Sequence, residues 1–471
     1  MKKYFVTNAI PYVNSRPHIG HALEFIQSDT IVRYYKLKGY DTLLLCGADE
    51  NALKNVQAAE AAGTDVRSLV DKNAALFEDL AKSLNVQFDI FQKGSDEKHY
   101  LSSQKLWELC DKTDDIYKKS YKGLYCVGCE TFYTPEELDE KGECFEHPGK
   151  KLEEIEEENY FFSLSKYQDK LLKIIESGEY KIIPEFRKNE VLSFIKSGLA
   201  DFSISRTNQR AKNWGVPVPN DPNQREYVWF DALNIYQSGV GFGWDDDMYH
   251  KWWPADLHVI GKGIIRFHAV YWPAILLSAG LELPKELFVH EYFTVDGQKM
   301  SKTLGNIYDP NIAIEKFGTD ALRYFCLAKI SPFQDGDFSE EKLKEAFNGD
   351  LSNGLGNLVA RVAKLCEQNN IKATKGSNVW CTDLEKYMEE FKFNEALSVI
   401  WQLIAQADKK INQEKPWELS GDKLKEVLED YVKRIQAISF NLQPFLPETA
   451  EKILKQFSGQ IKVQASLFPR I

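Results

Sequence analysis

Two short segments, far apart in the chain, carry side chains suited to binding phosphate. In the first, His18 and His21 stand at the start of an apolar-periodic run, from His18 to Leu37, that predicts a helix. Both imidazoles would project to one side near backbone amides that favour anions, and Gly20 lets a flat ligand approach the backbone. Paired histidines can hydrogen-bond phosphoryl oxygens as charge shifts in a transition state. Taken alone, a pair with this spacing is more often two surface histidines near a helix cap.

The second segment, DGQKMSKTLGN, runs from Asp296 to Asn306. It carries Lys299 and Lys302, with Ser301 between them and a glycine on either side. A loop with two ammonium groups can close over a triphosphate and neutralise its charge. By itself this segment could also be a solvated loop.

A third cluster has the spacing of a metal site. Cys126 and Cys129, followed by Cys144 and His147, form the pattern C-x2-C-x14-C-x2-H. Three thiolates and an imidazole satisfy tetrahedral zinc with no open position, so the pattern predicts one structural Zn2+ per chain. Reduced thiols without a metal are the alternative. Eight cysteines in a chain of 471 residues do not suggest a disulfide framework.

The elements around these segments alternate between strand and helix. Short apolar runs at Tyr4–Ala9 and Asp41–Gly47 predict strands on either side of the first helix, and the alternation predicts a doubly wound parallel sheet. A cysteine-rich, acidic and then proline-rich stretch from about Lys118 to Gln224 predicts an inserted domain. From Glu340 onward the helical periodicity predicts a terminal α-helical bundle. The predicted divisions are residues 1–117 and 225–290 for the two halves of the sheet domain, 118–224 for the insertion, 291–345 for the lysine-loop and stem-contact region, and 346–471 for the bundle.

Composition narrows the class of protein. The net charge of −11 argues against a nonspecific nucleic-acid coat, so a polyanionic partner must meet local patches. The first residues lack the unbroken apolar core of a signal peptide, which predicts a cytoplasmic location. The most apolar stretch, Ile264 to Leu281, contains Arg266, His268 and Pro273, so it predicts a buried helix and no membrane association.

The motif HIGH followed by KMSK, on either side of a split parallel-sheet domain, resembles the class I aminoacyl-tRNA synthetases. The segments AIPYVNSRPHIGH, VWFDAL, IRFHAVYWPAIL, VDGQKMSKTLGN and KPW extend the resemblance across essentially the whole chain, to the methionyl-tRNA synthetases. The resemblance implies a Rossmann-like α/β fold split by the zinc-binding insertion and followed by a helical anticodon-binding domain.

Roles follow from the resemblance residue by residue. Methionine would be bound by Ile10, Tyr12, Asp49, Trp229, Tyr236, His268 and Trp272. ATP would be bound by His18, Gly20, His21, Glu24, Gly261, Lys299, Ser301 and Lys302, with His18, His21, Lys299 and Lys302 as the catalytic set. The anticodon would be contacted by Asn357, Arg361 and Trp417. A thioether gains about 0.3–1.5 kcal/mol from each sulfur–aromatic contact, although tryptophan and tyrosine in apolar stretches are commonly core residues.

The implied reaction is an in-line attack of the methionine carboxylate on the α-phosphorus of Mg-ATP. It gives methionyl-adenylate, and the acyl group then passes to the 2′-hydroxyl of the terminal adenosine of tRNA(Met). The implied partners are L-methionine, ATP with Mg2+, and tRNA(Met), and we expect a monomer. The sequence departs from the family pattern in three places: at Asn51-Ala52, where His-Gly is common, at Gly263, where Asp is common, and at Thr303, where Ser is common. Cysteine, leucine, isoleucine or valine remain alternative substrates, and a catalytically idle RNA-binding paralogue is an alternative of another class.

Overall fold

The computed structural model describes residues 2–126, 131–133, 138–144, 149–300, 306–373, 376 and 379–471. Contacts within the chain define two compact units. The first unit comprises Met1–Pro17, Tyr40–Asp79 and Phe88–His290, and the second comprises His18–Gly39, Leu80–Gln87 and Glu291–Ile471. The five-part division predicted from the sequence stays a prediction.

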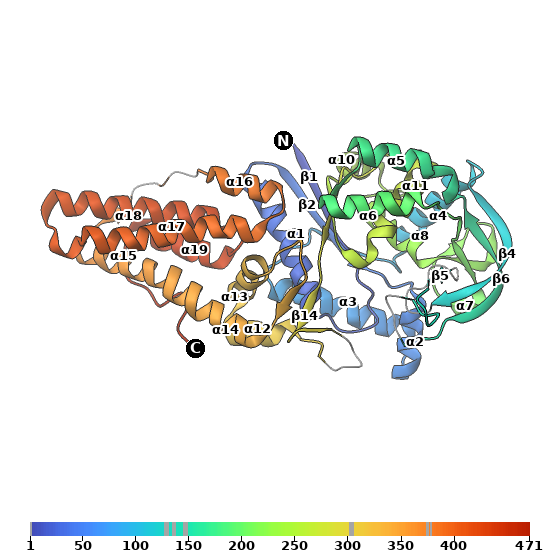
Figure 1. Ribbon diagram of the computed structural model, residues 1–471, viewed down its shortest axis with the longest axis horizontal. Coiled ribbons are helices and arrows are strands. Elements are labelled where there is room, and N and C mark those ends of the chain that lie inside the picture. Colours follow the sequence, from blue (N-terminus) through green and yellow to red (C-terminus); the bar gives the residue numbers. More distant parts are fainter. Residues whose placement is uncertain are drawn as a thin grey trace. The chain divides into compact units, whose positions relative to one another are not determined.

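The first unit contains a six-stranded parallel sheet, of which Figure 1 labels the strands β1 and β2. Its order is β3-β2-β1-β12-β13-β7, and each neighbouring pair is parallel. The strands are β1 (Lys3–Asn8), β2 (Asp41–Ala48), β3 (Ile90–Lys93), β7 (Lys181–Ile183), β12 (Leu257–Gly261) and β13 (Glu286–His290). The parallel α/β sheet predicted from the alternating pattern is confirmed. The strand order reverses at β1, between β2 and β12, which is where open α/β sheets bind ligands outside their strand ends.

The central strands are apolar because helices cover the sheet. Every residue of β12 is buried, as are the last four of β1, so these strands appear in sequence as nearly continuous apolar runs. The helical segments of this unit are α2 (Leu53–Ala62), α4 (Glu97–Asp111), α5 (Gln168–Ser177), α6 (Glu185–Lys196), α7 (Asn208–Ala211), α8 (Val228–Leu233), α9 (Ile235–Ser238), α10 (Asp246–Trp252), α11 (Trp272–Ser278), the 3-10 turns η2 (Leu164–Tyr167) and η3 (Lys262–Ile264), and the π-helical η4 (Phe267–Tyr271). The helix α3 (Val66–Ser83) spans both units. The stretch predicted as a buried helix therefore folds as η4 followed by α11.

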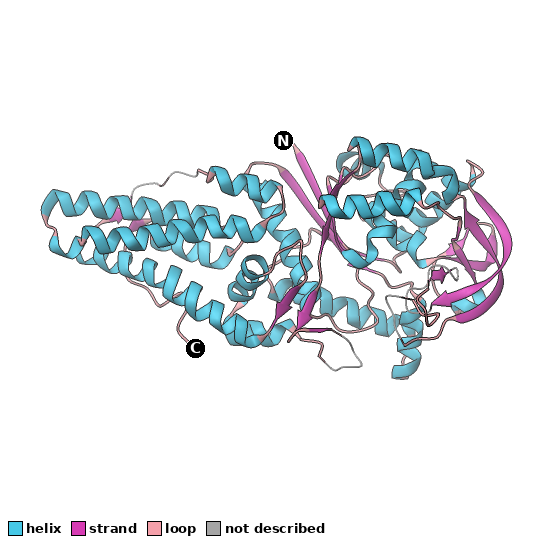
Figure 2. Cartoon of the chain, in the orientation of Figure 1, coloured by secondary structure: helices cyan, strands magenta, loops and turns pink. Residues whose placement is uncertain are grey.

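Two antiparallel sheets complete the first unit. The larger has the order β5-β4-β6-β8, with β4 (Ile116–Cys126), β5 (Thr131–Tyr133), β6 (Glu153–Phe162) and β8 (Phe202–Ser203). The smaller has the order β10-β11-β9, with β9 (Ser205–Thr207), β10 (Pro217–Val218) and β11 (Asp221–Glu226). Figure 2 shows the long, curved pair β4 and β6. Between β6 and β8 in sequence, the chain returns to the parallel sheet as β7, which pairs with β13.

The second unit is mainly helical. It contains α1 (Ile19–Leu37), α12 (Pro310–Phe317), α13 (Thr319–Tyr324), η5 (Phe325–Lys329), α14 (Glu340–Ala346), η6 (Phe347–Gly356), α15 (Asn357–Gln368), α16 (Thr382–Glu389), α17 (Phe393–Glu414), η7 (Pro416–Glu418), α18 (Gly421–Leu442) and α19 (Pro447–Gln456). Small sheets are formed by β14 (Phe293–Val295), β15 (Gln298–Lys299) and β16 (Gly336–Phe338), and by β17 (Lys372–Ala373) with β18 (Gly459–Gln460). The helices α15, α17, α18 and α19 run side by side (Figure 1). The helical bundle predicted from Glu340 onward is therefore confirmed.

A buried arginine joins α1 to the rest of the second unit. The Arg323 guanidinium is fully buried and lies 2.8 Å from the carboxylate of Asp29 on α1. It also donates hydrogen bonds to the carbonyls of Leu84, Pro444 and Phe445. A guanidinium has five donors, so burial is tolerated only where several acceptors converge as they do here. In the described part of the chain, no helix is both long enough and apolar enough to cross a membrane.

Candidate functional site

The two histidines of the first motif cap helix α1 and bond to each other's backbone. His18 is the N-cap residue, and its Nδ1 accepts a hydrogen bond of 3.1 Å from the backbone N–H of Gly20. Nδ1 of His21 accepts one of 3.1 Å from the N–H of His18. The two rings lie 3.9 Å apart between centroids. The arrangement is a capping box built from imidazoles in place of a hydroxyl and a carboxylate.

These bonds determine which nitrogen of each ring carries the proton. In both rings Nδ1 accepts from the backbone, so each neutral imidazole carries its proton on Nε2. Burial, together with the neighbouring His18, lowers the pKa of His21 well below its usual range, so His21 is neutral at physiological pH. The helix start thus presents neutral N–H donors, which suit the oxygens of a phosphate.

The lysine segment begins in a tight hairpin. The strands β14 and β15 are joined by Asp296 and Gly297, whose φ angles of +51° and +74° are the left-handed conformation that such two-residue turns require. The carboxylate of Asp337 on β16 accepts hydrogen bonds of 2.7 Å from the Gly297 N–H and from the Thr294 hydroxyl. Lys299 belongs to β15, but its side chain, Ser301 and Lys302 lie outside the described residues.

The two motifs meet within the second unit, although about 280 residues separate them. The N–H of Ile19, in the first turn of α1, donates a hydrogen bond of 3.0 Å to the carbonyl of Tyr308, just after the lysine segment. A Cβ built on Gly20 would lie 3.4 Å from Cε of Met300. Met300 stands between the two predicted lysines in sequence. Glu24, the other ATP residue predicted on α1, is partly buried one turn further along.

Aromatic and imidazole side chains form a connected cluster in the first unit. The hydroxyl of Tyr236 on α9 lies 2.8 Å from Nε2 of His268 on η4. Nδ1 of His268 donates to the carbonyl of Ile264 at 3.0 Å, so Nε2 must accept the tyrosine proton. Burial lowers the pKa of His268 to about 4. This imidazole is therefore a neutral acceptor at physiological pH, and it fixes the direction of the Tyr236 hydroxyl.

Trp229 on α8 connects this pair to the ends of β1 and β2. Its ring lies 6.5 Å from that of His268 and 6.1 Å from that of Tyr12, edge to face in both cases. Tyr12 forms a β-bridge with Asp49, which follows β2 and is 4% exposed. Five of the seven residues predicted to bind methionine thus form one chain of contacts.

The remaining two predicted methionine residues pack in the core of the first unit. Ile10 lies against the main apolar cluster, and Trp272 is a fully buried member of that cluster four residues after His268. The indole N–H of Trp272 finds no hydrogen-bond partner among the described residues. For these two residues the contacts fit a core role as well as a pocket wall.

Two neighbours of the cluster were missed from the sequence. Phe267 stacks on Trp229 with ring centroids 3.7 Å apart and planes 3° from parallel. His258 on β12 is fully buried 4.6 Å from the Tyr236 ring, and its Nε2 has no partner in the described part of the chain. The sequence offered only two signals for them: Phe267 stands next to His268, and His258 stands inside an apolar run that forms a strand.

The residues that depart from the family pattern, Asn51, Gly263 and Thr303, lie in different parts of the chain. The Asn51 side-chain amide donates to the Asp231 carboxylate at 2.8 Å and to the Gly94 carbonyl at 2.7 Å. Gly263 lies in the turn η3, just after Gly261, the last residue of β12 and a predicted ATP residue. Thr303 lies outside the described residues.

Half of the predicted metal site is described. The sulfur atoms of Cys126, at the end of β4, and Cys144 are buried and 3.2 Å apart. Cys129 and His147 lie outside the described residues, and no cluster of three metal-binding side chains occurs among the residues that are described.

The three predicted anticodon residues lie in the second unit. Asn357 is exposed at the start of α15, and Arg361 follows one turn later. The Arg361 guanidinium contacts Asp408 at 2.5 Å and Asn412 at 2.8 Å, both near the end of α17. Trp417 follows α17 in the turn η7 and is 55% exposed, so it is a surface residue and not part of the core.

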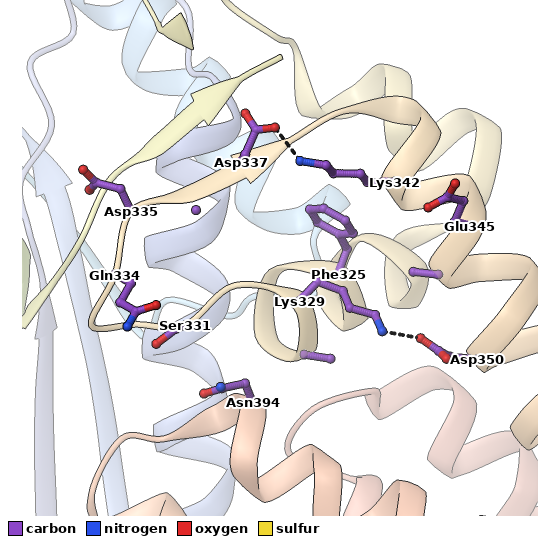
Figure 3. Close-up of a pocket in the computed structure, with 13 residues that line it drawn as sticks. Phe325, Lys329, Ser331, Gln334, Asp335, Asp337, Lys342, Glu345, Asp350 and Asn394 are labelled. Carbon is purple, nitrogen blue, oxygen red and sulfur yellow. Dashed lines mark hydrogen bonds and ion pairs between the residues drawn. The ribbon is translucent and has the colours of Figure 1, made fainter. Parts of the chain in front are cut away.

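A cavity of about 600 Å³ in the second unit is lined by Asp337 and its surroundings (Figure 3). Two ion pairs lie along it, Asp337 with Lys342 and Asp350 with Lys329. None of the predicted site residues lines this cavity. Its relevance to the lysine segment comes through Asp337, which also holds the Asp296-Gly297 turn.

Comparisons with known proteins agree with one another. A family model described as "tRNA synthetases class I (M)" matches residues 4–363. The chain is similar to the methionine–tRNA ligase of Thermotoga maritima, with 41% identity over 98% of this chain and 76% of that protein. It is also similar to that of Brucella suis, with 39% identity over 96% of this chain and 91% of that protein. The crystal structure of Mycobacterium tuberculosis methionyl-tRNA synthetase bound by methionyl-adenylate superposes with a TM-score of 0.92, at 36% identity over 99% of this chain and 100% of that one.

Proposed function

The chain belongs to the class I methionyl-tRNA synthetases, and from this premise we propose which of its residues carry each step of the reaction. It is a methionine–tRNA ligase, which joins L-methionine to tRNA(Met) at the cost of ATP. The observation that carries the assignment is the meeting of the two motifs in the second unit. The start of α1 bonds to the chain just after the lysine segment, and Met300 lies against Gly20.

In the activation step, a carboxylate oxygen of methionine attacks the α-phosphorus of ATP, and pyrophosphate leaves. His18 and His21 donate from Nε2 to phosphoryl oxygens, which gain charge as the transition state forms. Lys299 and Lys302 offset the charge of the departing pyrophosphate, and Mg2+ bound to ATP supplies further positive charge. Gly20, Glu24, Gly261 and Ser301 complete the proposed ATP contacts.

Methionine recognition is assigned to the aromatic cluster of the first unit. Trp229, Tyr12 and Trp272 offer apolar faces to a thioether, and Ile10 completes the wall. The Tyr236 hydroxyl, held by His268, provides a polar atom of fixed direction for the sulfur. Asp49 would bind the substrate ammonium, because a buried carboxylate gains a charge-assisted hydrogen bond from it.

Single-turnover measurements of methionyl-adenylate formation separate these roles. Replacing His18, His21 or Lys302 by alanine is expected to slow the chemical step by about 100-fold or more while the Kd for methionine stays within about twofold, since charge stabilisation of this kind is typically worth that much. Tyr236→Phe is expected to weaken methionine binding instead. If the His18, His21 and Lys302 variants weakened methionine binding as much as Tyr236→Phe does, the separate assignment of phosphate and methionine contacts would be contradicted.

We further propose that Cys126, Cys129, Cys144 and His147 hold one structural Zn2+. Support comes from the sulfur atoms of Cys126 and Cys144, which are buried and lie 3.2 Å apart, so two of the four proposed ligands already converge. When bound, zinc would cross-link these segments in the tetrahedral geometry that such ligands favour. Metal analysis should find one zinc per chain, and Cys144→Ser should lose it while the parallel sheet stays folded. Purified, fully reduced protein without zinc would contradict the proposal.

The anticodon surface is assigned to Asn357, Arg361 and Trp417. An exposed tryptophan is suited to stacking on unpaired bases, and an arginine or asparagine on the surface can hydrogen-bond their edges. Trp417→Ala should weaken aminoacylation of tRNA(Met) strongly and leave adenylate formation intact. An equal loss in both reactions would remove Trp417 from RNA reading. The monomeric state, the cytoplasmic location and the five-part domain layout remain proposals based on the sequence.

A further inference from the structure

The two helices that carry the central aromatic residues are too short to hold their own positions. The helix α8 has six residues and carries Trp229, while α9 has four and carries Tyr236. Helices of this length gain little from their own hydrogen bonds, so tertiary contacts must fix their positions.

One buried imidazole contacts both helices. His99, from α4, is fully buried. Its Nε2 lies 2.6 Å from Oδ1 of Asp231 on α8, and its Nδ1 lies 2.8 Å from the hydroxyl of Ser238 on α9. The Nε2–H therefore donates to a carboxylate, which is a stronger bond than one between neutral groups. A rigid ring thus sets the spacing between α8 and α9.

The same carboxylate extends the network to the end of β2. Oδ2 of Asp231 accepts a hydrogen bond from Nδ2 of Asn51, and the same nitrogen donates to the Gly94 carbonyl after β3. Asn51 stands two residues after Asp49. Asparagine has two amide hydrogens, which suits a position between a carboxylate and a carbonyl. A departure from the family pattern is thereby part of the support for α8.

The Asp231 carboxylate is buried and accepts two hydrogen bonds. Asp231 is 1% exposed, and its carboxylate receives donors from both His99 and Asn51. Burial, and then the charge of Asp231, raise the pKa of nearby Glu226 well above its usual range. Glu226 accepts a hydrogen bond of 2.6 Å from the Ser103 hydroxyl, while the donors of His99 and Asn51 go to Asp231.

We propose that His99, acting through Asp231 and Ser238, is the positioning residue that sets Trp229 and Tyr236 for methionine. This inference rests on the assignment of those two aromatics to the methionine site. His99 does not touch the substrate, and its effect comes through the two helices. Loss of either contact should therefore raise the KM for methionine and leave the KM for ATP nearly unchanged.

A matched pair of variants separates the two contacts. The Gln amide in His99→Gln can reach the Nε2 position and keep the bond to Asp231, whereas the Asn amide in His99→Asn can reach the Nδ1 position and keep the bond to Ser238. His99→Phe fills the space and keeps neither. In methionine-dependent pyrophosphate exchange, His99→Phe should raise the KM for methionine about tenfold or more, because a buried carboxylate loses a donor. The Gln and Asn variants should each recover part of that loss, and the KM for ATP should stay within about twofold.

A second variant avoids any disturbance of the buried ring. Ser238→Ala removes the contact between His99 and α9, together with a longer bond of 3.3 Å from the Ser238 hydroxyl to the Ile235 carbonyl within α9. It should raise the KM for methionine about twofold to tenfold, the value of one ordinary hydrogen bond. Ser439→Ala is the matched control, since Ser439 is also fully buried and bonds a carbonyl one helical turn away, in the second unit. It should leave both KM values unchanged.

Two results would overturn the inference. One is an unchanged KM for methionine in folded His99→Phe and Ser238→Ala. The other is an equal rise in the KM for ATP and for methionine. Trp229→Ala, measured alongside, distinguishes the causes. If Trp229→Ala raises the KM for methionine and the His99 variants do not, only the positioning inference is wrong. If Trp229→Ala also leaves this KM unchanged, the assignment of the methionine site is wrong, and the inference about His99 is wrong with it.

Discussion

Gly20→Ala perturbs the predicted phosphate site by a single methyl group. A Cβ at this position would lie 3.0 Å from Cε1 and 3.1 Å from Nδ1 of His18, which is closer than carbon atoms normally approach. It would also lie 3.4 Å from the Met300 methyl. The His18 ring must rotate away, and this breaks its bond to the Gly20 N–H and turns Nε2–H from its direction.

The expected cost follows from the bond that is lost in the transition state. A hydrogen bond to a charged group is worth about 1.5–3 kcal/mol, and every 1.4 kcal/mol is tenfold in rate, so adenylate formation should slow by about 10- to 150-fold. The KM for methionine should not change. Global unfolding is not expected, because the preference of a helix for alanine over glycine, about 0.5–1 kcal/mol, offsets part of the cost of the lost cap bond.

Rapid-quench measurement of adenylate formation is the assay, with circular dichroism to verify folding. Gly349→Ala is the control, since a Cβ there meets nothing within 4 Å, and its rate should match that of the unchanged protein. A folded Gly20→Ala protein with an unaltered rate would refute the role given to the His18 ring.

Four further predictions concern other parts of the chain. Arg323→Met should lower the free energy of unfolding by about 3–5 kcal/mol in urea titrations, because Asp29 keeps its charge and loses a buried partner; a loss below about 1 kcal/mol would contradict this. Burial lowers the pKa of His268 to about 4 in the folded protein, whereas a histidine in the unfolded chain has a pKa of about 6.5. Between these two pH values the unfolded chain therefore binds more protons than the folded protein. Stability should therefore be complete above about pH 6.5 and fall by about 3 kcal/mol as the pH drops to 4, and His268→Gln should remove this part of the slope. Asp337→Asn should slow adenylate formation several-fold with an unchanged KM for methionine, because the turn before Lys299 loses a charged acceptor; a change confined to the KM for methionine would argue against it. Tyr236→Phe should raise the KM for methionine about twofold to tenfold without slowing exchange at saturating substrate, and equal KM values for the two proteins would exclude a polar contact from this hydroxyl.

Periodicity and motif spacing predicted the elements that bear the motifs. The apolar run after His18 became α1, and the short apolar runs became strands of the parallel sheet, since helix and strand periods are local properties of the sequence. The reciprocal bonds between His18 and His21 were not predictable, because a capping box is normally recognised by a hydroxyl followed by glutamate or glutamine.

Contacts between distant segments explain what was missed. The strand β7 has three residues and no periodic signal of its own, and only its pairing with β13 identifies it. Phe267, His258 and His99 gained a connection to the aromatic cluster only through the fold, since each stands on a different element from the residue that it contacts. Trp417 is the reverse case, in which a residue that composition would place in the core is on the surface.

The most direct measurement is pyrophosphate exchange into ATP with methionine, leucine, isoleucine, valine and cysteine, each supplied alone to the purified chain. Methionine should support exchange with a kcat/KM at least about 100-fold above that of any other amino acid, because the smaller or branched side chains lose the sulfur contacts and pack poorly in an aromatic pocket. Faster exchange with another of the five, or no exchange with methionine by a folded protein, would contradict the claim that this chain activates methionine.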